Sequence, residues 1–297
     1  MQQERDGGER PVAFVTGASR GIGRATAIEL AEAGYDVAVS ARTMTDGAAH
    51  LEDDPSVVVP GGLDTTVASI ERAGGAGLAV PMDLLDRSAL TAAVSAVLDR
   101  FGRVDVLVNN AIYQGPGVLS LFADVTEDQL RTVLEGNVFA QVTLIRMVLP
   151  GMLERGGGTI VNMVSGAGYT DPPAKLGEGG WSLAYAMSKA AFARVAPLLH
   201  VEHGDDGLRI FSVDPGFVLT ERMEAAGRGA QYAQHFVPAT PAVIGRGIRW
   251  LVTSPDADAL RGQLVLAQRE VAKRGLLPGW PPEQRGPLPG GPPEQDM

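Results

Sequence analysis

The chain has 297 residues, a formal net charge of −10 at neutral pH and no cysteine. The negative charge argues against a nucleic-acid partner, which calls for a basic surface, and the lack of cysteine excludes disulfides and thiol chemistry. The N-terminus carries no apolar signal segment and no uncharged run reaches about 18 residues, so neither secretion nor a membrane span is predicted. These properties fit a cytoplasmic protein.

The folded part begins after a disordered-looking start at residues 1–10. Residues 11–16, PVAFVT, have the length and β-branched content of a buried strand, and a glycine-rich turn and the helical pattern RATAIELAEAG follow directly. In this context Gly17, Gly21 and Gly23 let the backbone approach a pyrophosphate, whose charge is met by the N–H groups at the helix start. The alternative is a glycine-rich turn with a structural role only.

Strands alternate with helices along the rest of the chain. Further strands are predicted at residues 37–41, 77–82, 103–109, 158–165, 208–214 and 262–267, and the main later helices at 127–155, 182–202 and 242–253. This alternation predicts one α/β domain over residues 11–270, a doubly wound parallel sheet of about seven strands with helices on both faces. Residues 271–297 are rich in proline and glycine and are expected to lie outside the core.

Tyr185 and Lys189 lie four residues apart in the helical pattern of residues 182–202, so both side chains project from one face. A phenol has a pKa of about 10, and a lysine ammonium one turn away favours the phenolate and lowers that pKa. The alternative is a solvated helix face. Ser165 ends the strand of residues 158–165, where it is either a hydrogen-bonding group of the site or an ordinary hydroxyl.

Five motifs occur in a fixed order: residues 16–23 (TGASRGIG), 109–111 (NNA), Ser165, 185–189 (YAMSK) and 214–216 (DPG). Together they resemble the short-chain dehydrogenase/reductase family, over roughly residues 11–267. The resemblance implies a Rossmann-type fold and an NAD(P)-dependent oxidoreductase that interconverts a secondary alcohol and a ketone or aldehyde.

The same resemblance implies the role of each catalytic group. Tyr185 donates or accepts the proton, Lys189 tunes it and binds the nicotinamide ribose, and Ser165 holds the substrate oxygen. Asn137 would hold a water in a proton relay, or else only bond nearby backbone. The implied cofactor residues are Gly17, Ser19, Arg20, Gly21, Ile22, Gly23, Arg42, Asp83, Leu84, Asn110, Ala111, Tyr185, Lys189, Pro215, Gly216, Val218 and Thr220. Of these, Asp83 would meet the adenine and Thr220 the nicotinamide carboxamide.

Cofactor choice depends on the end of the second strand. An NAD site places an acid there for the ribose hydroxyls, whereas this chain has Ala41 followed by Arg42. Arg42 and Arg20 could form charge-assisted hydrogen bonds with a 2′-phosphate, which favours NADP. The alternatives are that Arg42 stacks on adenine or is solvated, with NAD as the cofactor.

Three departures from the family pattern concern the surroundings of the site. Ser165 and Tyr185 are 20 positions apart, and the surplus at 171–181 is expected to remodel the substrate pocket. Ile112 replaces a usual glycine and would crowd the cofactor or substrate side. Residues 43–63 lengthen the connection after the second strand, where a solvated loop is the default.

The segment at residues 221–240 has the usual position of a mobile substrate lid. Its candidate apolar contacts, together with others elsewhere, suggest a small-molecule alcohol or carbonyl substrate with an apolar body. These candidate contacts are Met223, Tyr232, Phe236, Tyr113, Tyr169 and Trp181.

The resemblance also implies a homo-oligomer, a dimer or a tetramer, that pairs through the long helices at 127–154 and 182–202. His200 and His203 are predicted to cap a helix end rather than to bind a metal, so no metal site is expected. Two rival functions are a dinucleotide-sensing protein without turnover and a same-fold enzyme that performs epimerisation or dehalogenation. The presence of Ser165, Tyr185 and Lys189 argues against both.

Overall fold

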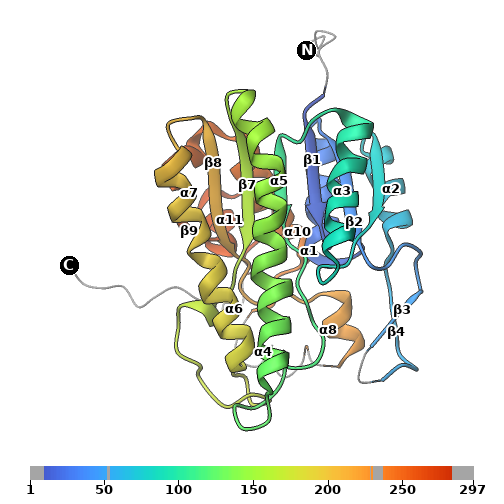
Figure 1. Ribbon diagram of the computed structural model, residues 1–297, viewed down its shortest axis with the longest axis vertical. Helices are drawn as coiled ribbons and strands as arrows, with labels where there is room; N and C mark the ends of the chain where they lie inside the picture. The colour runs from blue at the N-terminus through green and yellow to red at the C-terminus, as the bar shows by residue number, and fades with distance from the viewer. Residues whose placement is uncertain (1–9, 52–53, 228, 230–236, 283–297) are drawn as a thin grey trace, which may run out of the picture.

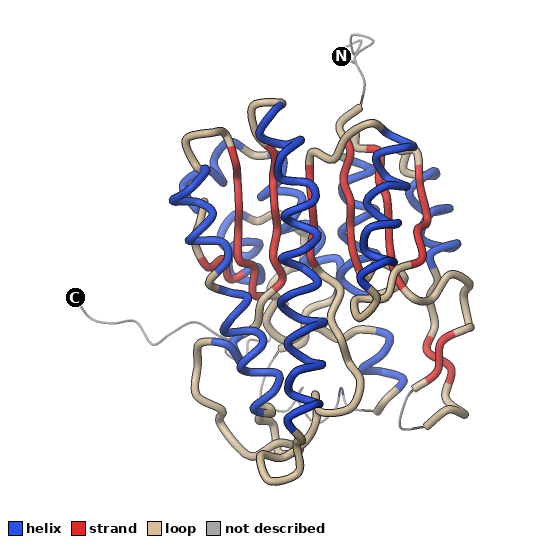
Figure 2. The backbone as a smooth tube through the Cα atoms, viewed as in Figure 1, coloured by secondary structure: helices blue, strands red, loops and turns tan. Residues whose placement is uncertain are grey.

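A seven-stranded parallel sheet organises the computed structural model, which describes residues 10–51, 54–227, 229 and 237–282. The strands are β1 (Val12–Thr16), β2 (Asp36–Ala41), β5 (Gly77–Pro81), β6 (Val106–Asn109), β7 (Gly158–Met163), β8 (Leu208–Asp214) and β9 (Leu264–Leu266). Their spatial order is β5-β2-β1-β6-β7-β8-β9, with every pairing parallel (Figures 1 and 2). The predicted doubly wound sheet is confirmed.

Helices cover both faces of the sheet. They are α1 (Gly21–Glu32), α2 (Leu63–Arg72), α3 (Arg87–Phe101), α4 (Glu127–Leu134), α5 (Ala140–Glu154), α6 (Leu183–Ala193), α7 (Val195–His203), α8 (Glu221–Ala225), α10 (Pro241–Thr253) and α11 (Ala267–Arg274). One core cluster joins the sheet to α1, α2, α10 and α11, and the other joins it to α3, α5 and α7, which lie in front of the sheet in Figure 1.

Strand β1 shows why the sheet needs both layers. All five of its residues are buried, and neighbouring side chains point to opposite faces, Phe14 into one core cluster and Val15 into the other. Burial of apolar surface contributes about 25 cal/mol per Å², so a continuous apolar run is stable only where helices cover both faces.

The strand order reverses next to β1, which lies between β2 and β6. The connections that follow β1 and β6 pass to opposite faces of the sheet. This leaves a crevice at the carboxyl ends of the two strands, which is where open α/β sheets bind ligands. In Figure 1 these ends point down, toward α8 and the lower part of α4. The fold therefore places the glycine-rich turn after β1 at the expected binding edge.

The predicted long helix at 127–155 is interrupted. Thr126 and Gln129 form a capping box at the start of α4, and residues Glu135–Phe139 form a π-helical segment before α5. Among the described residues, Glu127–Glu154 is the one helical run long and apolar enough to cross a membrane, and Leu144 and Met152 within it belong to the buried core against the sheet.

The predicted domain boundary at residue 270 is wrong, because it falls inside α11. Val271 is fully buried against the layer of α1 and α10, and Trp280 also packs there. The indole N–H of Trp280 donates to the carbonyl of Gln268 (3.2 Å). The short amphipathic pattern of α11 merges with the proline-rich tail in the sequence, so the end of the core is hard to locate there.

Residues 43–63 are more ordered than the solvated loop that we expected. They contain a two-stranded antiparallel hairpin, β3 (Ala49–His50) and β4 (Val58–Val59). The side chain of Val59 is fully buried, and the N–H of Gly61 donates to the carboxylate of Asp46 (2.6 Å). The segment is therefore held against the body of the protein.

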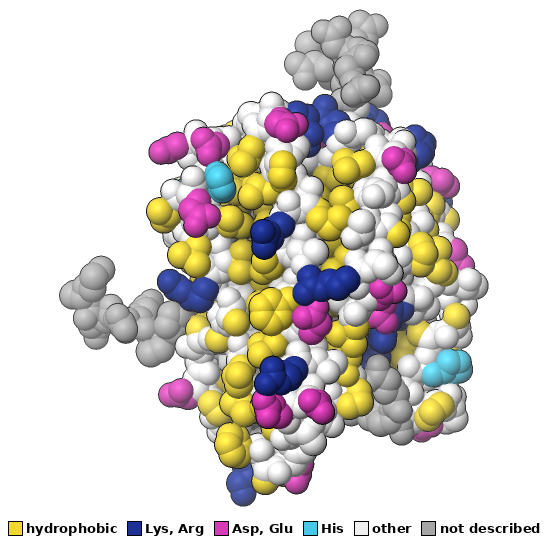
Figure 3. All heavy atoms as spheres, viewed as in Figure 1, with side chains coloured by type: hydrophobic (Ala, Val, Ile, Leu, Met, Phe, Trp, Pro, Cys, Tyr) yellow, Lys and Arg dark blue, Asp and Glu magenta, His cyan; other side chains and the backbone are white. Residues whose placement is uncertain are grey.

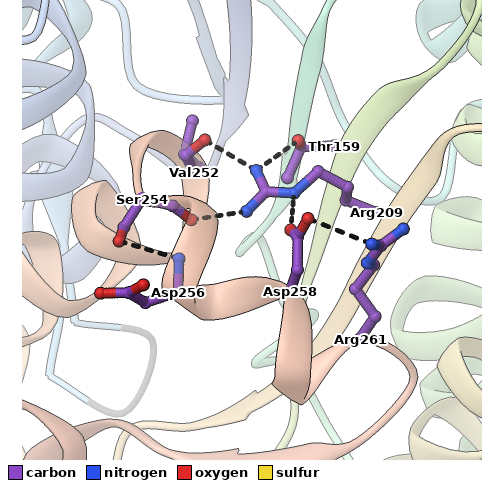
Figure 4. A network of polar contacts seen from close by, with 7 residues as sticks. All are labelled: Thr159, Arg209, Val252, Ser254, Asp256, Asp258 and Arg261. Carbon is purple, nitrogen blue, oxygen red and sulfur yellow. Dashed lines mark hydrogen bonds and ion pairs between the residues drawn. The ribbon is translucent and has the colours of Figure 1, made fainter.

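A partly buried arginine joins the segment that follows α10 to the sheet (Figure 4). Arg209 of β8 donates to the carboxylate of Asp258 (2.7 Å) and to the carbonyls of Val252 (2.8 Å) and Ser254 (3.0 Å). A guanidinium can satisfy several acceptors in one plane. This network fixes the end of α10 against β8.

Candidate active site

A cleft of about 280 Å³ opens at the carboxyl ends of β1, β2 and β6. It is lined by Gly17, Ser19, Arg20, Gly21, Ile22, Ala41, Arg42, Thr43, Met82, Asp83, Leu84, Asn110, Ala111, Ile112, Tyr113, Gln114, Thr220 and Arg222. Most of the predicted cofactor residues are in this set. The predicted residues that do not line it are Gly23, Tyr185, Lys189, Pro215, Gly216 and Val218.

The glycine-rich turn is packed too closely for side chains. Gly17 has φ +66°, and a Cβ there would lie 2.7 Å from the Cα of Ala111. A Cβ on Gly23 would lie 2.4 Å from the carbonyl oxygen of Gly17. Asn110 locks the turn, because its side-chain amide donates to the carbonyls of Thr16 (2.9 Å) and Gly17 (3.1 Å). The turn can therefore approach a phosphate group closely.

A carboxylate of the chain itself lies at the start of α1. The N–H of Gly21 donates to Oε2 of Glu221, the first residue of α8 (2.9 Å). A helix N-terminus favours negative charge because its N–H groups lack partners within the helix. The contact therefore places an anion where a pyrophosphate is expected, and the sequence motifs did not reveal it.

Arg20 and Arg42 differ in their surroundings. The Arg20 guanidinium donates to the carbonyls of Pro60 (2.7 Å) and Gly61 (2.7 Å), so it fastens the hairpin segment to the glycine turn. Arg42 directly follows β2 and lines the cleft. Arg20 lines the same cleft, so both predicted phosphate ligands border it.

The three expected catalytic side chains come from two adjacent elements. Tyr185 and Lys189 lie on α6, and Ser165 follows β7. Ser182 caps α6 by accepting from the N–H of Tyr185 (3.2 Å), which fixes the start of the helix. Lys189 is 2% exposed, and its ammonium donates to the carbonyl of Met163 (2.8 Å) and lies 5.8 Å from the centre of the Tyr185 ring.

The electrostatics of this group differ from the expectation that Lys189 lowers the pKa of Tyr185. Burial raises the pKa of the Tyr185 phenol above its usual value; a hydrogen bond with Ser165 opposes the shift, and the carboxylate of Asp214 adds to it. Burial lowers the pKa of Lys189 to about 8, and Asp214 opposes that shift. Desolvation therefore dominates both groups.

Asn137 lies in the π-helical segment and is 1% exposed. Its Oδ1 accepts from the N–H of Tyr113 (2.7 Å), and its Nδ2 donates to the hydroxyl of Ser188 (3.2 Å). The side chain thus links the loop after β6 to α6. π-Helical insertions often occur at functional sites because they redirect side chains, and here the insertion turns Asn137 toward α6.

The turn at residues 215–217 is held by a residue that sequence reasoning missed. Gln268 of α11 is 2% exposed, and its side-chain amide donates to the carbonyls of Pro215 and Phe217, both at 2.9 Å. The N–H of Ala239 also donates to the carbonyl of Phe217 (3.0 Å). Gln268 stands between the strand predicted to end at residue 267 and the tail predicted from residue 271, so no sequence motif includes it.

The expected apolar substrate contacts do not all lie at the cleft. Ile112, expected on the cofactor or substrate side, and Tyr113, an expected substrate contact, both line the cleft. Tyr169 instead turns its hydroxyl to the buried carboxylate of Asp214, to which it donates a hydrogen bond. Tyr232 and Phe236 lie outside the described residues.

The two histidines considered for a metal sit at the end of α7. Nδ1 of His203 contacts the carboxylate of Asp206 (3.0 Å). Within residues 10–51, 54–227, 229 and 237–282, no group of three or more His, Cys, Asp or Glu side chains could hold a metal ion.

The doubly wound sheet, the glycine turn at its switch point and the Ser165, Tyr185 and Lys189 group together define a nicotinamide-dependent oxidoreductase. The family model described as short chain dehydrogenase matches residues 11–231. The chain therefore belongs to the short-chain dehydrogenase/reductase family and is an NAD(P)-dependent enzyme of that family.

Two relatives illustrate the sequence similarity. A 3-oxoacyl-[acyl-carrier-protein] reductase of Synechocystis is 30% identical over 256 residues, which cover 85% of this chain and 93% of the relative. An uncharacterized NAD-dependent oxidoreductase of Mycobacterium tuberculosis is 33% identical over 231 residues, which cover 75% of this chain and 77% of the relative.

Solved structures extend the comparison to the fold. A short-chain dehydrogenase/reductase from Burkholderia xenovorans aligns with a TM-score of 0.71 at 27% identity, covering 87% of this chain and 94% of that one. A 7α-hydroxysteroid dehydrogenase in complex with NADH and 7-oxoglycochenodeoxycholic acid aligns with a TM-score of 0.70 at 27% identity, covering 87% and 92%.

Proposed function

We propose that the protein is an NADP(H)-dependent oxidoreductase that interconverts a secondary alcohol and a ketone, with Tyr185 as general acid and base. The observation that supports this proposal is the group of Ser165, Tyr185 and Lys189, in which Ser165 and Tyr185 share a hydrogen bond and the Lys189 ammonium lies 5.8 Å from the centre of the Tyr185 ring. A protein that only senses dinucleotides has no need for this group.

The bound nicotinamide supplies or accepts the hydride. The chain must then stabilise the negative charge that develops on the carbonyl oxygen, and provide a proton. Ser165 and Tyr185 share a hydrogen bond, and in the proposed reaction both donate to that oxygen. Burial keeps Tyr185 protonated near neutral pH, which suits a proton donor. Lys189 supplies positive charge beneath it, and Asn137 is the candidate to order a water in the proton path.

The chain fits a dinucleotide at this edge. The close packing of Gly17 and Gly23 leaves the turn free of side chains, and Gly21 offers an N–H to an anion. Asp83 and Leu84 line the cleft where the adenine would lie, and Thr220 closes it near the nicotinamide end.

The preference for NADP(H) is supported by Ala41 and Arg42 at the end of β2, where an NAD site would carry an acid. NAD(H) is the alternative cofactor, because Arg20 is already bound to the carbonyls of Pro60 and Gly61, and because the M. tuberculosis relative is named NAD-dependent. Direct binding measurements separate the two.

Titration of Arg42→Ala with both nucleotides tests the cofactor. Losing one charge-assisted hydrogen bond costs roughly 1.5–3 kcal/mol, so we expect NADPH binding to weaken about ten- to a hundred-fold while NADH binding changes little. Arg131→Ala, on exposed α4, is the control and should alter neither. Equal losses for both nucleotides would mean that Arg42 contacts the adenine, and NAD(H) would replace NADP(H) in the proposal.

A turnover screen with both nucleotides tests the reaction. The panel should include 3-oxoacyl thioesters and oxosteroids, since relatives are named for such substrates, and other carbonyls with an apolar body. Tight nucleotide binding without turnover would favour the sensor.

We also place the enzyme in the cytoplasm and infer self-association through the face formed by α4, α5, α6 and α7, where hydrophobic side chains gather (Figure 3).

A further inference from the structure

A buried carboxylate lies beside the catalytic pair. Asp214 is the last residue of β8 and is 4% exposed. Its Oδ1 accepts from the N–H of Gly216 (2.8 Å), and its Oδ2 accepts from the hydroxyl of Tyr169. The N–H of Gly166 also contributes a hydrogen bond. A carboxylate is rarely buried without such partners, because desolvation of the charge is costly.

The charges around Asp214 come from every element that packs near it. On α6, the ammonium of Lys189 donates to the carbonyl of Met163, and Met163 pairs in the sheet with Val213, the residue before Asp214. Ser165, which shares a hydrogen bond with the phenol of Tyr185, directly precedes Gly166, whose N–H bonds to Asp214. From the loop after β7, Tyr169 donates its proton, and Arg269 of α11 acts on Tyr169. In return Asp214 opposes the lowering of the Lys189 pKa by burial, and adds to the raising of the Tyr185 pKa.

We propose that Asp214, held in place by Tyr169, is a positioning residue that keeps Lys189 charged and Tyr185 protonated, and thereby favours carbonyl reduction over alcohol oxidation. This inference rests on the proposed function of Tyr185. It adds a fourth ionisable group to the site, one that acts through its neighbours and touches neither substrate nor cofactor.

The chemistry explains the bias in direction. Reduction needs a phenol that gives its proton to the substrate oxygen, whereas oxidation needs a phenolate that accepts the alcohol proton. A negative charge near the phenol penalises the phenolate. It also stabilises the ammonium of Lys189, which burial alone would drive toward the neutral amine. Asp214 therefore stabilises the resting state that donates a proton.

Tyr169 has a distinct part in this arrangement. Burial and the neighbouring carboxylate both raise its pKa, so its hydroxyl stays protonated and remains a donor to Asp214. Burial raises the pKa of Asp214, and the hydrogen bond from Tyr169 is the largest opposing influence. Without Tyr169 the carboxylate would take up a proton more readily, and its effect on α6 would weaken.

The first test is Asp214→Asn. The amide has nearly the same shape, its oxygen can still accept from Gly216, and its nitrogen can donate to the oxygen of Tyr169, so the fold is expected to persist. Removing the charge lowers the pKa of Tyr185, because Asp214 raises it. The oxidation rate then reaches its plateau at lower pH, and the reduction rate falls at lower pH. We expect the midpoints of both profiles to fall by about 0.5 to 1 pH unit.

Asp36→Asn is the matched control, because Asp36 begins β2, which four strands separate from β9 and three from β8. It should leave both pH profiles in place. Tyr169→Phe should shift the profiles in the same direction as Asp214→Asn by a smaller amount. A folded Asp214→Asn enzyme whose two profiles coincide with those of the wild type would overturn the proposal.

A second measurement does not need turnover. The chain has three lysines, and Lys175 and Lys273 are exposed, so the double variant Lys175→Arg, Lys273→Arg leaves Lys189 as the single lysine. Its pKa can be followed by NMR of 15N-labelled lysine. We expect Asp214→Asn to move this pKa further below about 8. An unchanged Lys189 pKa would refute the inference, whereas a shifted pKa in an enzyme without turnover would retain the coupling and refute the proposed function.

Discussion

Tyr185 exchanges its proton in surroundings that oppose its ionisation. It is partly buried, its phenol has a raised pKa, and the hydrogen bond with Ser165 is the one influence that acts in the other direction. The ammonium of Lys189 donates a hydrogen bond to the carbonyl of Met163. The phenol is therefore protonated and can act as an acid, and the hydrogen bond with Ser165 favours release of its proton.

Removing this phenol should abolish most turnover while leaving the cofactor site intact. In Tyr185→Phe we expect turnover to fall by at least about 10² because the proton donor is lost. Nucleotide affinity should change little, since the cleft is lined by other residues. Single-turnover and titration measurements separate the two effects. Tyr35→Phe, which changes a half-buried tyrosine after α1, is the control, and near-normal activity in Tyr185→Phe would refute the assignment.

The sequence predicted which residues gather at the site better than it predicted what they contact. The family resemblance implied that Ser165 and Tyr185 act together, and the two side chains share a hydrogen bond. The direction of a flexible side chain depends on neighbours that are distant in sequence. Arg20 reaches the carbonyls of residues 60 and 61, and Asp214 accepts from Tyr169, 45 positions away in the sequence. No local pattern encodes those contacts.

At the scale of elements, one hydrogen bond joins α8 to the start of α1, and a bound cofactor would compete for its N–H donor. Glu221 begins α8, and its carboxylate accepts a hydrogen bond from the N–H of Gly21. Phosphate groups of a nucleotide would meet both this occupied donor and the repulsion of the carboxylate. Binding is therefore expected to displace Glu221 and to couple the position of α8 to the cofactor.

Glu221→Gln should strengthen nucleotide binding. A carboxylate at a helix N-terminus contributes about 0.3–1 kcal/mol, so removing its charge should raise the affinity for NADPH and NADH alike by about two- to five-fold. Calorimetric titration at low salt measures the effect. Glu224→Gln, on the exposed side of the same helix, should show no comparable gain. A weaker affinity in Glu221→Gln would instead make Glu221 a supporting part of the site.

Elements were predictable where a long periodic pattern buries one side of a helix or both sides of a strand. All seven strands of the sheet were located from apolar runs. The short elements were not, because two-residue strands such as Ala49–His50 and Val58–Val59 carry no periodicity. The π-helical segment Glu135–Phe139 was also invisible, since its side chains keep a helical pattern on either side.

At the scale of the whole molecule, several large apolar side chains are exposed on one face. On the layer of α5, α6 and α7, Val201 is 85% exposed, Leu198 58% and Phe139 53% (Figure 3). A stable interface buries about 800 Å² on each partner, and pairing this face with a second copy would remove these side chains from water. The net charge of −10 on each chain opposes that pairing.

Association should therefore depend on both salt and apolar contact. We expect the wild-type protein to sediment as a dimer or tetramer at micromolar concentration, and more completely as salt rises, because salt screens repulsion beyond a Debye length of about 8 Å near physiological ionic strength. The double variant Leu198→Asp, Val201→Asp should sediment as a smaller species, since it adds charge to an interface that must lose water. Val58→Asp, in the hairpin away from this face, should associate normally. A wild-type monomer at every salt concentration, or a double variant that assembles like the wild type, would show that this face is not the contact between copies.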